Sequence, residues 1–161
     1  STQGVSSAAS DVYKRQGGRV IASDIAADKL DALKAELPDA DITTVAGDLT
    51  KQDAIDAVIA AAGDRIDALA NVAGINDDFS PAGETTDAVW DRVIAINLTA
   101  PFKLMRAVLP IMEKAGRGSI LNVSSEAGLR GNSSGNAYTA SKHGIIGVTK
   151  SAAFMLSLIH I

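Results

Sequence analysis

The sequence contains no cysteine, and only 2 of its 161 residues are histidine. Without cysteine the chain forms no disulfide and offers no thiolate ligand, and nothing in it indicates an oxidising compartment. The histidines, His143 and His160, lie apart in the sequence, so we expect no metal site. Basic residues are also few: 15 Lys and Arg against 19 Asp and Glu give a net charge of −4. Nucleic-acid binding needs a basic surface to neutralise phosphates, so no nucleic-acid partner is expected.

Long hydrophobic runs are absent as well. The longest, from Phe154 to Ile161, is interrupted by Ser157 and His160 and is too short to cross a bilayer. The N-terminal residues show no basic region followed by an apolar stretch, which is the pattern of a signal peptide. We therefore expect a cytoplasmic protein with no membrane partner.

From Gly17 onward, short apolar runs alternate with helical patterns. The predicted strands are 19–24, 42–46, 66–72 and 119–124. The predicted helices are 26–37, 50–62, 86–96, 98–115 and a last one from 137 onward. Strands separated by helices pair in parallel through crossover connections. The predicted fold class is therefore α/β, a doubly wound, mostly parallel, Rossmann-like sheet with helices on both faces.

Several residues are expected to mark the ends and bends of helices. Thr50 is expected to cap its helix with Asp53 as a partner, and Gly63 to end it. Pro101 suits the first turn of the helix at 98–115, whereas Pro110 should kink that helix.

In doubly wound sheets, ligands bind beyond the carboxyl ends of the strands. The polar residues that end or follow predicted strands are Asp24, Asp48, Asn71 and Ser125. The sharpest motif, Tyr138-Thr-Ala-Ser-Lys142, places a phenol and an ammonium four residues apart, on one face of a helix. The ammonium and the helix N-terminus both favour the phenolate form. A phenol tuned in this way can exchange a proton with an alcohol or a carbonyl compound.

Three further segments accompany this motif. Ser125, 13 residues before Tyr138, can donate a hydrogen bond to a substrate oxygen that gains charge. For the adjacent Ser124 we prefer loop capping. Asn71 opens the segment Asn-Val-Ala-Gly, whose small residues allow the backbone to approach a flat ligand closely. Asn97 lies between two predicted helices.

The order and spacing of these motifs resemble the short-chain dehydrogenase/reductase family over about residues 17–153. The motifs are N-x-A-G at Asn71–Gly74, Asn97, Ser125 and Y-x-A-S-K at Tyr138–Lys142. The resemblance implies a nicotinamide-dependent oxidoreductase that passes a hydride to or from a small-molecule alcohol or carbonyl substrate. It implies that Tyr138 is the general acid/base and that Lys142 supports it and holds the nicotinamide ribose. By the same resemblance, Ser125 would orient the substrate oxygen, and Asn97 would anchor a water linked to Lys142.

The resemblance also implies where a cofactor would bind. Asp24 would accept hydrogen bonds from the adenosine ribose and repel a 2′-phosphate, which favours NAD over NADP. A cap for the helix that begins near Ala26 explains Asp24 about equally well. Asp48 and Leu49 would contact the adenine ring. The residues that would line the rest of the cofactor cleft are Asn71, Ala73 and Gly74.

Both ends of the chain depart from the family pattern. Residues 1–16 contain no apolar strand and no T-G-x-x-x-G-x-G loop, the element that receives the pyrophosphate. Residues 154–161 also lose the pattern. We expect 1–16 and 154–161 to be segments foreign to the family, translated from sequencing adapters, and 17–153 to be the central part of the dinucleotide-binding domain. Strands would then be missing on both sides, so we expect this chain itself to bind NAD weakly and to be inactive.

Alternatives to an NAD-dependent alcohol dehydrogenase or ketone reductase stay open. One is a 3-oxoacyl-thioester reductase, against which Asp24 weighs because that reaction usually takes NADP. Another is a non-catalytic dinucleotide-binding protein, although such proteins typically lose the Tyr or the Lys. The resemblance implies a homodimer or homotetramer. Four further residues are predicted to have no catalytic or binding role. Asp77 and Asp78 are expected to be solvated loop charges, His143 to face solvent and Trp90 to be a packing residue.

Overall fold

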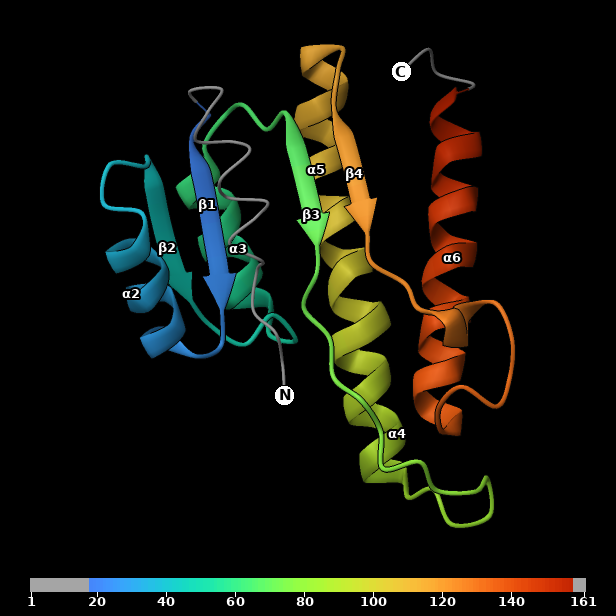
Figure 1. Ribbon diagram of the computed structural model, residues 1–161. Coiled ribbons are helices and arrows are strands. Elements are labelled where there is room, and N and C mark those ends of the chain that lie inside the picture. The colour runs from blue at the N-terminus through green and yellow to red at the C-terminus, as the bar shows by residue number, and fades with distance from the viewer. Residues whose placement is uncertain (1–17, 158–161) are drawn as a thin grey trace. The chain divides into compact units, whose positions relative to one another are not determined.

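The computed structural model describes residues 18–157, which belong to two compact units divided between Gly63 and Asp64 (Figure 1). The predicted foreign segment 1–16, and residues 158–161 of the other, lie outside the described residues. The elements of the first unit are β1 (Val20–Asp24), α2 (Ala27–Glu36), β2 (Ile42–Ala46) and α3 (Gln52–Ala62). β1 and β2 pair in parallel, from Val20 opposite Ile42 to Asp24 opposite Ala46, and both helices contact the pair.

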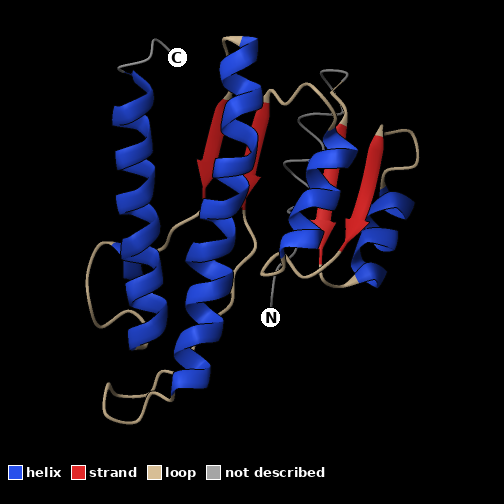
Figure 2. Cartoon of the chain, turned by 180° about the vertical axis from the view of Figure 1, so that it is seen from behind, coloured by secondary structure: helices blue, strands red, loops and turns tan. Residues whose placement is uncertain are grey.

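The second unit contains the other parallel pair and the longer helices (Figure 2). Its elements are β3 (Ala68–Asn71), α4 (Asp87–Ile94), a π-helical turn η1 (Ala95–Thr99), α5 (Ala100–Ala115), β4 (Ser119–Asn122), a 3₁₀ turn η2 (Glu126–Gly128) and α6 (Asn136–Ser157). β3 and β4 pair in register from Ala68 opposite Ser119 to Asn71 opposite Asn122. The predicted strands at 66–72 and 119–124 are therefore shorter than expected.

These two parallel pairs correspond to two neighbouring strand pairs of a doubly wound sheet. In the order 3-2-1-4-5-6, strands 2 and 3 are neighbours, strands 4 and 5 are neighbours, and strand 1 joins the two pairs. Among residues 18–157, β1 pairs with β2 and β3 with β4, and no strand pairs with members of both sheets. The prediction of an incomplete α/β fold with parallel strands is confirmed.

The helices predicted at 86–96 and 98–115 are one continuous rod, so the predicted break is wrong. Thr86 caps it by accepting a hydrogen bond from the backbone N of Val89. A π-helical turn at Ala95–Thr99 replaces the break, and such turns often accompany functional sites. Pro101 lies in the first turn of α5, as predicted, and Gly116 ends the helix in a left-handed conformation (φ 68°).

Among the described residues, this rod, Asp87–Ala115, is long and apolar enough to cross a membrane by length and composition alone. Its apolar side chains Val93, Leu104 and Val108 are, however, buried in the second unit. Burial of that stripe identifies the rod as the central helix of a folded unit. A core of this kind fixes the position of the π-helical turn relative to α6, which packs against η1.

Thr50 does not cap α3 as predicted. The helix begins at Gln52, with Lys51 as an N-cap residue that makes no side-chain capping bond. Both the backbone N and the hydroxyl of Thr50 donate instead to Asp48 Oδ1, at 3.0 and 2.7 Å. The carboxylate forms a tight turn with the residue two positions on, and that turn competes with the cap. Gly63 ends α3, as predicted, with φ 80°.

Candidate active site

Tyr138 and Lys142 come together in the first turns of α6. Lys142 Nζ lies 5.5 Å from the centre of the Tyr138 ring, within reach of a cation–π interaction. The same Nζ donates a hydrogen bond to the carbonyl oxygen of Val123, just after β4, at 3.0 Å. Lys142 is only 5% exposed, and this burial lowers the pKa of its ammonium. The helical spacing therefore yields a phenol beside a buried amine, as the motif suggested.

Asn97 holds the loop after β3 against α6. Its Oδ1 accepts from the backbone N of Ile75 at 2.9 Å, and its Nδ2 donates to the carbonyl of Ile75 at 2.8 Å. Nδ2 also donates to Ser141 Oγ, at 3.2 Å. Both amide hydrogens are thus used within the protein, so the side chain can offer a water molecule only a lone pair of Oδ1.

Gly74 lies between Asn97 and Lys142. A Cβ atom at Gly74 would lie 3.4 Å from Asn97 Oδ1 and 3.6 Å from Lys142 Nζ. A larger side chain here would cover the amine, so the glycine keeps one side of Nζ open.

Ser125 and Ser124 do different things at the end of β4. Ser125 has an extended backbone, and its Oγ accepts from the backbone N of Ala127 at 3.2 Å, which starts the η2 turn. Its hydroxyl hydrogen remains available for a substrate oxygen. Ser124 donates to the carbonyl of Lys142 at 3.1 Å. A Cβ at Gly128 would overlap Ser124 Oγ and lie 2.7 Å from that same carbonyl, so a glycine is needed for η2 to pack on α6.

Asn71 is tied into a polar network that the sequence analysis missed. Its Nδ2 donates to Asn122 Oδ1 at 2.8 Å, and Asn122 Nδ2 donates to Thr149 Oγ1 at 2.9 Å. The network joins β3, β4 and α6. The strand register places Asn71 opposite Asn122, but the register itself was not evident from the sequence. Of its two neighbours in the N-x-A-G segment, Ala73 is exposed and Gly74 is half-buried.

Asp24, Asp48 and Leu49 lie in the first unit, at or just beyond the carboxyl ends of its strands. Asp24 Oδ1 accepts from the backbone N of Ala26 at 2.9 Å. The cap position of α2 is Ala26 itself, which has no side-chain capping bond, so Asp24 forms a turn before the helix. Hydrogen bonds from Thr50 lower the pKa of Asp48 and keep it ionised.

Asp77 was predicted to be a solvated loop charge, and this is wrong. It is 8% exposed and accepts hydrogen bonds from the backbone N atoms of Gly135 and Tyr138, at 3.1 and 2.9 Å. Asp78, by contrast, is exposed, as predicted. The difference could not be read from two adjacent aspartates, because the donors to Asp77 come from a segment 58 and 61 residues further on.

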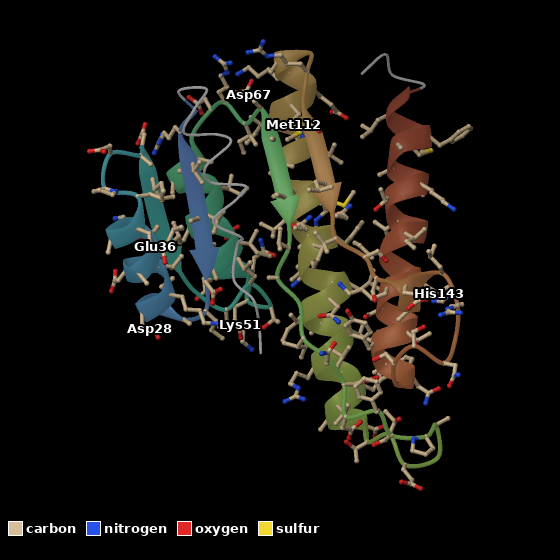
Figure 3. All side chains as sticks on the ribbon, in the orientation of Figure 1. Asp28, Glu36, Lys51, Asp67, Met112 and His143 are labelled. Carbon is tan, nitrogen blue, oxygen red and sulfur yellow. The ribbon has the colours of Figure 1, made fainter. Side chains whose placement is uncertain are left out.

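The predictions for Trp90 and His143 have opposite outcomes. Trp90 is 42% exposed, so it is not the packing residue that was predicted: it falls outside the buried stripe of α4, where Val93 lies. His143 is exposed, as predicted, and lies on the side of α6 away from α5 (Figure 3). Among the described residues, no three His, Cys, Asp or Glu side chains gather as they would around a metal ion.

Comparison with known proteins gives consistent matches. The family model for short chain dehydrogenases matches residues 1–161. The short-chain dehydrogenase/reductase cdmF of Talaromyces verruculosus is 46% identical in an alignment of 159 positions that covers 96% of this chain and 60% of that protein. Asnovolin H dehydrogenase nvfC of Aspergillus novofumigatus is 40% identical over 158 residues, with the same coverage. The chain thus spans about 60% of the length of these curated relatives.

Solved structures agree with this assignment. A metagenomic short-chain oxidoreductase in complex with NADP is 38% identical, with a TM-score of 0.88 over 97% of this chain and 73% of that one. Levodione reductase is 31% identical, with a TM-score of 0.85 over 92% of this chain and 60% of that one. The motifs, the parallel α/β pairs and these matches lead to one conclusion: the chain belongs to the short-chain dehydrogenase family.

Proposed function

We propose that this chain carries the catalytic part of a nicotinamide-dependent oxidoreductase that interconverts a small-molecule alcohol and a carbonyl compound. The observation that carries the proposal is the buried Lys142 amine held beside the Tyr138 ring. Ser125, with its free hydroxyl hydrogen, follows the end of β4. A proton donor, a cation that stabilises its conjugate base and a hydrogen-bond donor for the substrate oxygen are what this chemistry needs.

The residues around Lys142 suit the ribose and nicotinamide end of the cofactor. Lys142 Nζ makes one hydrogen bond, to Val123, so two of its three hydrogens are left for ribose hydroxyls. Gly74 leaves room beside that nitrogen. When bound, the cofactor supplies or accepts the hydride.

The chain's own residues would then handle the proton. In the reductive direction, Ser125 donates a hydrogen bond to the carbonyl oxygen, and the Tyr138 hydroxyl transfers its proton to that oxygen as charge develops. The Lys142 ammonium stabilises the phenolate that remains. In the oxidative direction the phenolate accepts the proton of the alcohol. Asn97 acts here by holding Ile75 and Ser141 in place, next to Gly74 and Lys142.

We test this function in two forms of the protein. The chain is assayed by itself, and also spliced into the cdmF relative in place of the segment that aligns with it. A panel of secondary alcohols and ketones is followed through the absorbance of the reduced cofactor. We expect turnover in the chimera and weak cofactor binding by the chain alone. A folded chimera that turns over no member of the panel would contradict the proposal.

For the cofactor we propose NAD rather than NADP. Asp24 ends β1 and uses one carboxylate oxygen for Ala26, so the other is free to accept from a ribose hydroxyl. The metagenomic relative was solved in complex with NADP, which favours the opposite cofactor preference. This same preference weighs against a 3-oxoacyl-thioester reductase.

Substitution of Asp24 by asparagine should shift this preference toward NADP. Removing the carboxylate charge removes the repulsion of a 2′-phosphate, so the ratio of kcat/KM for NADP over NAD should rise about tenfold, equivalent to ~1.4 kcal/mol. The ratio is measured in the chimera. Asp28→Asn, at an acidic position in the first turn of α2, is the matched control and should leave the ratio unchanged. A wild-type preference for NADP would overturn the assignment.

We also propose that the protein forms a homo-oligomer. An apolar groove between α5 and α6 supports this, because exposed apolar surface of this kind is typical of an interface. Its apolar lining residues are Phe102, Met105, Leu109, Pro110, Val148 and Ala152. A cytoplasmic location stays a prediction from the sequence.

A further inference from the structure

The N-terminus of α6, which carries Tyr138, is capped by a residue from a distant segment. The first N–H groups of any helix have no partner within the helix. In α6 the N–H of Tyr138 is one of these, and Asp77 Oδ2 accepts its hydrogen bond at 2.9 Å. Asp77 Oδ1 accepts from the backbone N of Gly135 at 3.1 Å and from Ser134 Oγ at 3.3 Å. A carboxylate in this position also interacts favourably with the helix dipole.

The fit between Asp77 and the start of α6 is close. Asp77 is 8% exposed, and a Cβ atom at Gly135 would overlap its carboxylate. Oδ1 also receives a longer contact from the backbone N of Phe79, at 3.4 Å, where the chain turns through a left-handed residue (φ 59°). The carboxylate therefore shapes its own loop and the helix start together.

The loop that carries Asp77 is fixed to α6 at further points. The loop joins the end of β3 to α4 (Figure 1), and through Asp77 it contacts the first turn of α6. Asn97 holds Ile75 and reaches Ser141, next to Lys142. Asn136 Nδ2 donates to the carbonyl of Ser80, at 3.1 Å. The contacts thus reach α6 between Asn136 and Ser141, at the turn that carries Tyr138.

We infer that Asp77 is a positioning residue for Tyr138. It acts through the backbone, by capping α6 at the turn that carries the phenol, and holds the ring beside Lys142. Its consequence for turnover rests on the proposed function, but its consequence for the helix does not. This role does not depend on the negative charge of Asp77 acting on the substrate. An uncharged oxygen acceptor in the same place would also cap the helix.

The first test measures the amide hydrogen exchange of Tyr138 in the 161-residue chain. In Asp77→Ala the amide loses a bond to a charged acceptor, so its exchange should accelerate at least about tenfold. Asp77→Asn keeps one oxygen acceptor and should restore much of the protection. Asp78→Asn, which alters a carboxylate bonded only within its own loop, should leave this exchange unchanged. Equal protection in the wild type and in Asp77→Ala would overturn the inference.

A second variant keeps the test decisive if Asp77→Ala does not fold. Gly135→Ala retains the carboxylate but pushes it from its place, so it should accelerate exchange at Tyr138 in the wild-type background. Combined with Asp77→Ala, where the space is empty, Gly135→Ala should have no further effect. An effect that is the same in both backgrounds would contradict the proposed contact.

The third measurement reports on the position of the Tyr138 ring. Lys142 Nζ lies 5.5 Å from the ring centre, so the ring current shifts the NMR signals of the Lys142 ε-methylene protons. Asp77→Ala should reduce that shift, and Asp77→Asn should recover it, while the amide protection of Ile145, deeper in α6, stays as in the wild type. A shift that survives Asp77→Ala alongside faster exchange at Tyr138 would show that Asp77 caps the helix without positioning the phenol. An inactive chimera would contradict the proposed function but would not affect the exchange and NMR results, which do not depend on activity.

Discussion

Replacing Tyr138 with phenylalanine is expected to lower kcat by about 10²–10⁴-fold, the contribution typical of a general acid or base. The substitution removes only the hydroxyl. The ring, and with it the contact with Lys142 Nζ, is retained. The fold and the KM for cofactor should therefore change little. The measurement is steady-state turnover in the chimera, followed through cofactor absorbance.

The next residue on the helix offers a matched control for Tyr138→Phe. Thr139 Oγ1 is buried and has no hydrogen-bond partner, so Thr139→Val removes a neighbouring hydroxyl without breaking a hydrogen bond. We expect Thr139→Val to leave kcat unchanged. Near-normal turnover in Tyr138→Phe would show that another group moves the proton and that the proposed mechanism is wrong.

The sequence predicted the parts of the site that depend on local spacing. Residues four apart on a helix share a face, so the meeting of Tyr138 and Lys142 follows from the motif alone. The strand predicted at 42–46 and the stop of α3 at Gly63, a residue that accepts φ 80°, also depend on local sequence. Their positions matched the structure.

The parts that could not be predicted depend on contacts between distant segments. Asp77 looked like any acidic loop residue, because its donors at Gly135 and Tyr138 lie far along the chain. The link from Asn71 to Asn122 needs the register of β3 against β4, which one sequence does not reveal. Thr50 is a local failure: its own N–H and hydroxyl donate to Asp48, and the helix begins beyond it at Gln52.

The same distinction explains the π-helical turn. The sequence predicted two helices, 86–96 and 98–115, with Asn97 between them and Pro101 in the first turn of the second. In the structure the rod continues, and Asn97 satisfies its amide on the backbone of Ile75 and on Ser141. A buried asparagine whose hydrogen bonds all lie across the fold is a tertiary feature, and it places the loop of Asp77 beside α6.

Replacing Lys142 with methionine is expected to lower kcat by at least about 10²-fold while raising the stability of the chain. The loss of rate follows because the phenolate of Tyr138 loses the cation that stabilises it. The gain in stability follows because Lys142 is only 5% exposed, and its contacts in the structure are the carbonyl of Val123 and the Tyr138 ring rather than a carboxylate. Burial of a charge without an opposite charge is costly, and methionine fills similar space without that cost.

The pH dependence of this gain has a definite sign. Burial lowers the pKa of Lys142 in the folded chain below its ordinary value of 10.5. Between the lowered pKa and 10.5 the unfolded chain binds more protons than the folded chain, so wild-type stability rises with pH across that window. The penalty is present in full below the lowered pKa. The advantage of Lys142→Met should therefore be largest near neutral pH and should shrink as the pH approaches 10.5.

The measurement is thermal unfolding of the 161-residue chain at several pH values. At neutral pH we expect Lys142→Met to raise Tm by about 2–4 °C, the shift that about 1 kcal/mol produces in a chain of this size. Lys150→Met, the same substitution at an exposed position of α6, is the control and should change neither Tm nor kcat. The lost hydrogen bond to the carbonyl of Val123, a residue that is 40% exposed, is expected to weigh little. A Tm that falls in Lys142→Met would show that this bond outweighs the cost of burying the charge, and that Lys142 stabilises the fold as well as the phenolate.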